Sequence, residues 1–162
     1  MELILEASEV TDPEERIKFL PSLVGLTWCA IFEDAAFRMA GDMIEEYGSG
    51  FWRFVRISDQ DGNFVTGFMY PDLDQEVTFL SMNGSVEKMS ARHAGLCITL
   101  TALSQLSFHI HGDRFGTQAA VEHVATQYHT LRDWLYEGEF AELAGKPKQQ
   151  LDAMQPLIKV LD

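Results

Sequence analysis

The fold of this chain is decided by a stretch whose side chains alternate between two faces, Phe51-Trp52-Arg53-Phe54-Val55-Arg56-Ile57-Ser58. Alternation with period two is typical of a β-strand. One predicted face carries Phe51, Arg53, Val55 and Ile57, and the other carries Trp52, Phe54 and Arg56. Residues 59–63 have the composition of a turn, and residues 64–70 return as a second strand. The centre of the chain therefore predicts an antiparallel hairpin.

Further strands are predicted on both sides of this hairpin. Residues 76–82 and 85–89 flank Asn83-Gly84, a dipeptide that strongly favours a tight hairpin turn. Residues 23–32 form an apolar run with β-branched and aromatic members, which predicts part of another strand. We therefore expect an antiparallel meander sheet of four to five strands.

Helical patterns surround the predicted sheet. Asp12-Pro13 followed by Glu15 has the pattern of a helix N-terminus with a capping carboxylate, and this short helix should end before Pro21. A second helix should run from Glu33 to about residue 47. Residues 91–108 are apolar on most sides, which predicts a buried helix, and residues 118–136 carry one apolar stripe. The fold class is predicted to be α+β, with about four helices packed on the sheet.

The domain organisation is predicted to be simple. The chain has 162 residues, which is the length of one ordinary domain. We expect a single domain over residues 1–145 and a tail over residues 146–162, in which residues 151–160 form a short helix. Cys29 and Cys97 lie in apolar runs, as reduced core thiols do, and the first residues lack the pattern of a signal peptide. These features predict a cytoplasmic protein without a membrane segment.

The acidic side chains suggest a kind of partner. There are 25 acidic and 12 basic residues, for a formal charge of −13, so direct binding to nucleic acid or to an anionic membrane is disfavoured. The segment between Arg56 and Lys88 has no basic residue but contains Asp59, Asp61, Asp72, Asp74, Glu76 and Glu87. These acids predict one acidic rim that a basic partner recognises. The competing interpretation is that loop charges suppress aggregation of the sheet.

Side chains with catalytic potential do not form a recognisable motif. His109-x-His111 with Asp113 has part of a zinc pattern, but the ligand number is short and a solvated loop is the better interpretation. No nucleophile elbow, phosphate loop or dinucleotide fingerprint occurs in the sequence. We therefore predict neither catalysis nor a cofactor. Trp52 and Trp134 suit either an exposed interaction anchor or a packed position, and packing is the commoner role for tryptophan.

Several motifs in a fixed order resemble one known family. They are Arg16-Ile17-x-Phe19-Leu20-Pro21, Glu46-Tyr47 before Gly50-Phe51-Trp52-x-Phe54, Gly67-Phe68-Met69-Tyr70-Pro71, Met89-Ser90-Ala91-x-x-Ala94-Gly95 with Leu103-x-x-Leu106, and Tyr128-His129-x-Leu131-Arg132-Asp133-Trp134. This series resembles the ArdB/KlcA antirestriction family from about Pro13 to Leu143. The chain departs from the family at Gly48-Ser49-Gly50, in the length of the first hairpin and in the tail.

The resemblance implies a cytoplasmic protein encoded on a plasmid or genomic island. It further implies a compact fold, no catalytic activity and relief of type I restriction, so that incoming unmodified DNA survives. The family's candidate partner-binding residues map onto Arg16, Glu33, Trp52, Ser85 and Asp133.

Three functional hypotheses follow. The first is an antirestriction protein that acts by protein contact on a type I restriction-modification system, directly or through a host factor. The second is an acidic DNA mimic that binds in the DNA channel of a restriction enzyme. The third, from a different class, is a metal-dependent enzyme that uses His109 and His111.

Overall fold

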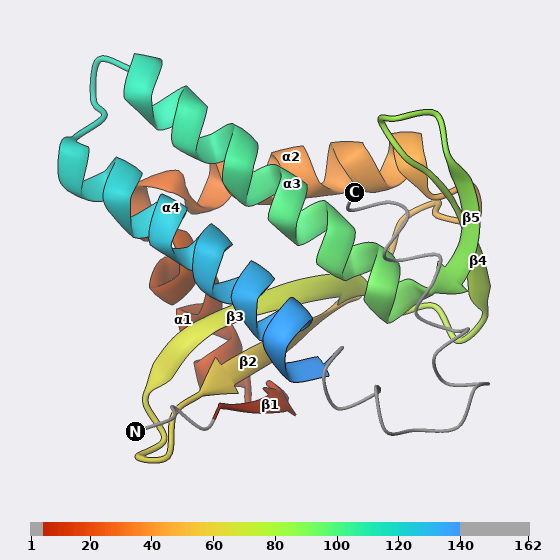
Figure 1. Ribbon diagram of the computed structural model, residues 1–162, viewed down its shortest axis with the longest axis horizontal. Coiled ribbons are helices and arrows are strands. Elements are labelled where there is room, and N and C mark those ends of the chain that lie inside the picture. The colour runs from red at the N-terminus through yellow and green to blue at the C-terminus, as the bar shows by residue number, and fades with distance from the viewer. Residues whose placement is uncertain (1–4, 140–162) are drawn as a thin grey trace.

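The computed structural model describes residues 5–139 and arranges them as a three-stranded sheet between helices, with a separate two-stranded sheet beside it (Figure 1). The described strands are β1 (Glu6–Glu9), β2 (Trp52–Ser58), β3 (Phe64–Pro71), β4 (Glu76–Leu80) and β5 (Val86–Ser90). The described α-helices are α1 (Pro13–Val24), α2 (Cys29–Met43), α3 (Ala91–Gly112) and α4 (Gln118–Asp133), with a 3₁₀-helix at Leu26–Trp28 and a π-helix at Trp134–Glu139. This mixture of helices and antiparallel strands confirms the predicted α+β class.

The larger sheet has the order β1-β2-β3, and both strand pairs are antiparallel. Val55 is paired with Phe68, both are at most 1% exposed, and the Phe68 ring lies 6.0 Å from that of Trp134, just beyond α4. On the opposite face, Phe54 stacks on Phe19 of α1 with ring centroids 4.6 Å apart. The predicted alternation is therefore confirmed within β2, and it gives the sheet one face for α1 and one for the end of α4, as Figure 1 shows.

Helix α3 is apolar on most sides because it is buried on most sides. Every residue from 94 to 100 is buried. Thr99, in this run, accepts a hydrogen bond from the N–H of Met69 at 3.1 Å and donates one to the C=O of Met69 at 3.2 Å. Helix α3 thus covers the outer edge of β3 and satisfies backbone groups that would otherwise be unpaired in the core.

Replacing this hydroxyl should destabilise the protein. We expect Thr99→Val to lower the free energy of unfolding by about 1–3 kcal/mol, because both backbone groups of Met69 lose a buried partner. Thr101→Val is the matched control, since the Thr101 hydroxyl donates to the carbonyl of Cys97 in its own helix. The control should cost under about 0.5 kcal/mol in a urea titration. Equal costs for the two variants would contradict this role of Thr99.

Strands β4 and β5 form a separate two-stranded sheet within the described chain. The predicted single meander is therefore divided in two, although the predicted number of strands holds. The reason is that α3 occupies the edge of β3 to which the next strand would have been added. Strand β4 instead bridges the segment after α2, where Ile44 pairs with Phe79 and the N–H of Glu45 donates to the C=O of Thr78 at 3.1 Å.

The predicted hairpin at Asn83-Gly84 is confirmed, with a longer loop than the dipeptide suggests. The N–H of Ser81 donates to the C=O of Ser85 at 2.9 Å, so Met82, Asn83 and Gly84 lie in the loop. Gly84 has φ 86°, the left-handed conformation that ends a three-residue hairpin loop.

The strand predicted over residues 23–32 is wrong. This run contains the end of α1, the 3₁₀-helix and the start of α2. Composition cannot separate a buried strand from two helix ends that meet in the core. Helix α1 also continues through Pro21 to Val24, because Leu23 and Val24 are at most 1% exposed and their burial outweighs one lost backbone hydrogen bond.

Other boundaries also differ from the predictions. Asp12 stands at the N-cap of α1 without a side-chain capping hydrogen bond. His109 and His111 belong to the last turn of α3 and not to a loop. Strand β1 was missed because Glu6-Ala7-Ser8-Glu9 is short and polar.

Two predictions concern parts of the chain at its ends. The tail over residues 146–162 and its short helix lie outside the described residues. Within residues 5–139 no single helix is long and apolar enough to cross a membrane, and the one pair that together has the length and composition, Pro13–Val24 with Leu26–Met43, is bent by 95°.

Candidate functional site

Arg16 lies on α1 against the start of β2. Its Nη2 donates to the carbonyl of Trp52 at 2.9 Å, and its Nη1 donates to the carbonyl of Val10 at 3.5 Å. The guanidinium carbon lies 4.4 Å from the ring centroids of both Phe51 and Phe54. A planar cation against aromatic faces is stabilised by cation–π attraction. Arg16 therefore joins α1 to β2 and positions both rings.

Trp52 is a packed residue and not an exposed anchor. It is 4% exposed, and its indole N–H donates to the hydroxyl of Tyr47 at 3.1 Å. Its ring centroid lies 5.8 Å from that of Tyr47 and 5.3 Å from that of Phe37 on α2. The side chain of Trp52 thus connects Tyr47, in the segment after α2, with Phe37 of α2. Its backbone carbonyl holds Arg16 in place by accepting the hydrogen bond from Nη2.

The protein surface next to Arg16 and Trp52 consists of aromatic rings and the guanidinium of Arg16. Phe51 is 58% exposed and Phe37 is 38% exposed. Among the described residues no carboxylate lies within ion-pair distance of Arg16. We call this set the Arg16 patch; its members are Arg16, Phe37, Tyr47, Phe51, Trp52 and Phe54. Phenylalanine and arginine are both enriched in the cores of protein interfaces, so this exposed pair is a candidate contact surface.

The structure brings two of the five predicted site residues together, Arg16 and Trp52. Glu33 is half-buried in α2, one helical turn before Phe37, so it borders the patch by its spacing. Ser85 lies in the β4–β5 hairpin, where its hydroxyl donates to the Glu87 carboxylate at 3.1 Å. Asp133 is exposed at the end of α4. Ser85 and Asp133 therefore belong to other parts of the fold.

Phe51 is the residue that sequence reasoning placed wrongly. Period two assigned Phe51 to the face of Arg53 and Val55. In the structure its ring instead packs on the guanidinium of Arg16, as the ring of Phe54 does. The alternation does not extend to it, because β2 begins at Trp52 and the preceding Gly50 has φ 142°. The signal that could have identified Phe51 is the motif Gly50-Phe51-Trp52, in which the glycine frees the backbone before an aromatic pair.

The histidines predicted as metal ligands are not gathered into a metal site in the described residues. Nε2 of His109 lies 3.6 Å from Oδ2 of Asp113, and no group of three or more His, Cys, Asp or Glu side chains within residues 5–139 could hold a metal ion. His109 also contacts Trp28, with ring centroids 6.1 Å apart at an interplanar angle of 79°. The described part of the molecule therefore gives the metal hypothesis no ligand set.

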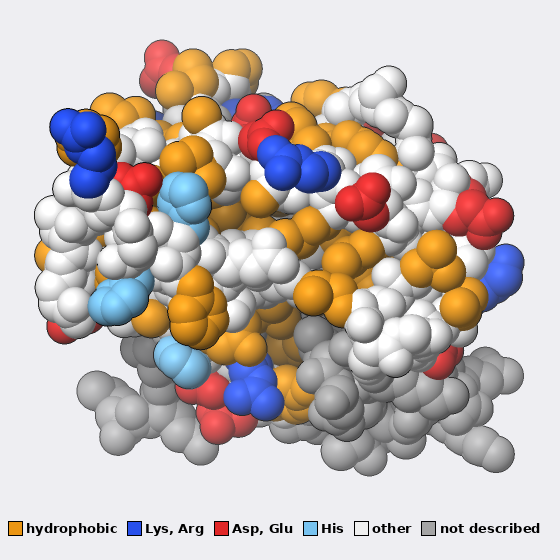
Figure 2. Space-filling model, turned by 90° about the horizontal axis from the view of Figure 1, so that it is seen from above, with side chains coloured by type: hydrophobic (Ala, Val, Ile, Leu, Met, Phe, Trp, Pro, Cys, Tyr) orange, Lys and Arg blue, Asp and Glu red, His pale blue; other side chains and the backbone are white. Residues whose placement is uncertain are grey.

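The prediction of one acidic rim is wrong, because the acids lie at opposite ends of β3. Asp59 accepts from the N–H of Asp61 at 3.0 Å and of Asn63 at 2.9 Å, in the turn before β3. These bonds, that of Asn63 first, hold the pKa of Asp59 below its usual value. Asp72 follows β3 and pairs with Nε of Arg53 at 2.7 Å. Eight strand residues span roughly 25 Å. Figure 2 also shows the acidic side chains of the upper face scattered among apolar ones.

The fold and the patch define a small acidic α+β protein with a partly exposed aromatic patch around an arginine. Residues 45–143 match the model of the antirestriction protein family. Two antirestriction proteins KlcA of Escherichia coli are similar to this chain. One is 31% identical over 73% of this chain and 77% of its own length, and the other is 30% identical over 80% and 83%.

A solved structure supports the same relationship. It covers 92% of both chains with a TM-score of 0.65 and 28% identity. It comes from work on the KlcA and ArdB proteins, which show a novel fold and antirestriction activity against type I DNA restriction systems in vivo but not in vitro. The chain belongs to the antirestriction protein family, of the ArdB/KlcA type.

Proposed function

We propose that this protein relieves type I restriction of incoming unmodified DNA by contact with another protein and without catalysis. The observation that carries the proposal is the structural match over 92% of both chains to proteins with this activity in vivo. We also propose a cytoplasmic location, since restriction acts on DNA that has entered the cell, and a gene on a mobile element, whose transfer relief of restriction would favour.

The chemistry of the Arg16 patch supports contact over catalysis. Its members are aromatic rings and a guanidinium whose Nη1 and Nη2 donate to backbone carbonyls. Such groups provide apolar area and a fixed positive charge, whereas acid–base or nucleophilic catalysis requires a group that gives up or accepts a proton near neutral pH. We infer that Arg16 and Phe51 form the centre of the partner-binding surface, that the buried Trp52 supports them from the core, and that Glu33 lies at the border. Ser85 and Asp133 remain separate candidates.

The relatives' activity in vivo but not in vitro favours a partner other than the DNA channel of the enzyme. A protein that occupied this channel would inhibit the purified enzyme as well. Direct mimicry of DNA remains the second candidate, because the net charge is −13. Asp59 precedes β3 and Asp72 follows it, so these acids do not form the continuous row of charges that a DNA mimic requires. Binding to purified type I enzyme at low salt would favour mimicry, and its absence would exclude it.

The test of the proposed function is a plating experiment. Unmodified and modified phage are plated on cells with a type I restriction system, with and without the protein. We expect the protein to raise the plating of unmodified phage several-fold and to leave the plating of modified phage unchanged. Unchanged restriction with soluble protein present would exclude antirestriction as the function of this chain.

A further inference from the structure

Arg53 of β2 holds two carboxylates, one from each side of its strand. Its Nη1 donates to Oε1 of Glu9 at 2.6 Å, and its Nε donates to Oδ1 of Asp72 at 2.7 Å. Glu9 is the last residue of β1, and Asp72 directly follows β3. A planar guanidinium presents its donors in a fixed fork, so one side chain can serve both carboxylates. Arg53 therefore joins the three strands of the larger sheet at one end.

Asp72 connects Arg53 to Phe51. The N–H of Asp72 donates to the C=O of Phe51 at 2.8 Å, while Arg53 holds its carboxylate. Phe51 stands just before β2, and the preceding Gly50 has φ 142°, a backbone conformation that favours glycine. A Cβ at Gly50 would meet nothing within 4 Å. The residue before Phe51 thus leaves it free to move, and Asp72 restrains it.

Glu9 connects Arg53 to Arg16 in a similar way. Val10 directly follows Glu9, and its C=O accepts from Nη1 of Arg16 at 3.5 Å. The N–H of Val10 donates to the C=O of Phe54 at 2.8 Å, and the ring of Phe54 lies against the guanidinium of Arg16. Arg53 therefore acts on both partners of the exposed contact, on the phenylalanine through one carboxylate and on the guanidinium through the other.

We propose that Arg53 is a positioning residue of the partner-binding surface, because it holds the ring of Phe51 on the guanidinium of Arg16 in the orientation that the partner recognises. This inference rests on the proposed role of the Arg16 patch, and it requires no contact between Arg53 and the partner. The competing account is that the ion pairs only stabilise the sheet. The side chains of Arg53, Glu9 and Asp72 are 36%, 35% and 31% exposed, and ion pairs that water reaches contribute little to stability. Their exposure therefore favours the positioning role.

Nuclear magnetic resonance of the Arg16 side chain separates these accounts without any measurement of restriction. The ring currents of Phe51 and Phe54 shift the Arg16 protons upfield, since the guanidinium carbon lies 4.4 Å from both ring centroids. Phe51→Ser measures the part of this shift that Phe51 causes. We expect Arg53→Met, which keeps an apolar stem and loses the fork, to remove most of that part. Arg53→Lys keeps the charge without the fork and should remove less.

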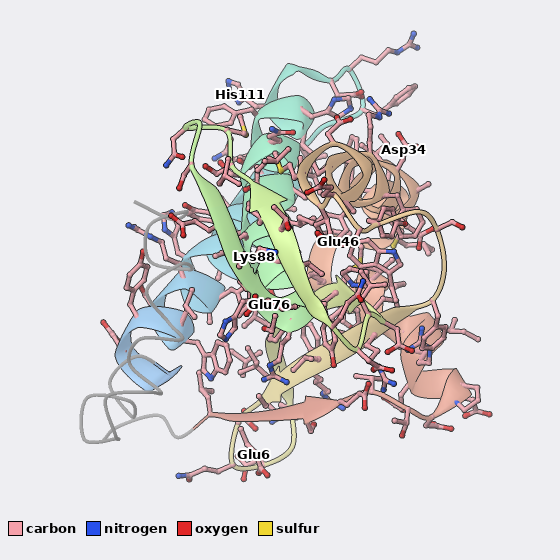
Figure 3. All side chains as sticks on the ribbon, turned by 90° about the vertical axis from the view of Figure 1, so that its right-hand side faces the viewer. Glu6, Asp34, Glu46, Glu76, Lys88 and His111 are labelled. Carbon is pink, nitrogen blue, oxygen red and sulfur yellow. The ribbon has the colours of Figure 1, made fainter. Side chains whose placement is uncertain are left out.

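Glu9→Ala tests the same series of contacts from β1, and it decides the question if Arg53→Met does not fold. It removes the acceptor of Nη1, so it should also reduce the upfield shift of the Arg16 protons. Glu6→Ala is the matched control. Glu6, labelled in Figure 3, is also exposed and lies at the opposite end of β1, so its loss should leave the shift unchanged.

Phage plating then connects the position of the ring to function. We expect Arg53→Met to reduce restriction relief several-fold, with no further reduction when it is added to Phe51→Ser, because both changes act through the same ring. An unchanged Arg16 signal in both Arg53→Met and Glu9→Ala would overturn the proposal. A loss of relief in Arg53→Met that adds in full to the loss in Phe51→Ser would overturn it as well. Failure of the proposed function would appear instead as absent relief by the parent protein, a result on which the Arg16 signal does not depend.

Discussion

Gly95→Ala is expected to lower the free energy of unfolding by about 3 kcal/mol or more, which is among the largest effects of one added methyl group. A Cβ at Gly95 would lie 2.5 Å from the carbonyl oxygen of Met69 and from Cα of Tyr70, and it would also collide with Cβ of Tyr70. These atoms are backbone or next to it, so they cannot rotate away. Helix α3 would have to move off β3, which would break the hydrogen bonds of Thr99.

Gly41→Ala is the matched control for this prediction. Gly41 also lies in a helix, but a Cβ there would meet nothing within 4 Å. Alanine favours a helix over glycine by about 1 kcal/mol, so Gly41→Ala should stabilise the protein. Thermal denaturation should show Gly95→Ala melting about 6–12 °C below the parent protein and Gly41→Ala melting slightly above it. A melting temperature of Gly95→Ala near that of the parent would show that α3 does not approach β3 as closely as described.

Phe51→Ser is expected to reduce restriction relief at least about tenfold while the protein stays folded, because truncating a hot-spot residue at the centre of an interface costs about 2 kcal/mol or more. Phe51 is 58% exposed, so its loss removes contact area without opening the core. Trp52 is unsuitable for this test, since it is 4% exposed and its replacement would destabilise the fold. The measurement is phage plating, combined with a circular dichroism spectrum of the purified variant.

Phe115→Ser is the control for this substitution. Phe115 is 69% exposed and also lies beside an arginine, with the guanidinium carbon of Arg114 4.7 Å from its ring centroid. The Arg114–Phe115 pair lies in the loop between α3 and α4, away from the predicted partner-binding residues. The Phe115→Ser variant should therefore retain full restriction relief. Equal relief by the two variants and the parent would remove the Arg16 patch from the proposed function without affecting the family assignment.

Much of the secondary structure could be predicted because each element carries a local physical signal. The alternation over residues 51–58 predicted β2 apart from its first residue, the glycine of Asn83-Gly84 predicted a hairpin, and the apolar surface of residues 91–108 predicted most of the buried helix α3. The motif series likewise indicated the family, because the order of motifs along a chain is itself a property of the sequence.

The grouping of strands could not be read from the same signals. Strands β4 and β5 look like a continuation of the meander, but α3 returns over residues that lie about thirty positions earlier and takes the edge of β3. Strand β1 has no apolar pattern of its own and exists through its pairing with β2, in which Glu9 stands opposite Val55. Pairing between distant segments is decided by which edges remain free, and this depends on the whole fold.

Periodicity, turn chemistry and motif order are properties of the chain, so they were enough to predict the α+β class, most helices and strands and the family. The tertiary structure decided that Arg16 and Trp52 meet while Ser85 and Asp133 lie apart, and that the acids divide between the two ends of β3. It also decided that Phe51 joins Phe54 on the guanidinium of Arg16. The contact of Arg16 with Phe54 joins residues 38 positions apart in the chain, and only the packing of α1 on β2 brings such residues together.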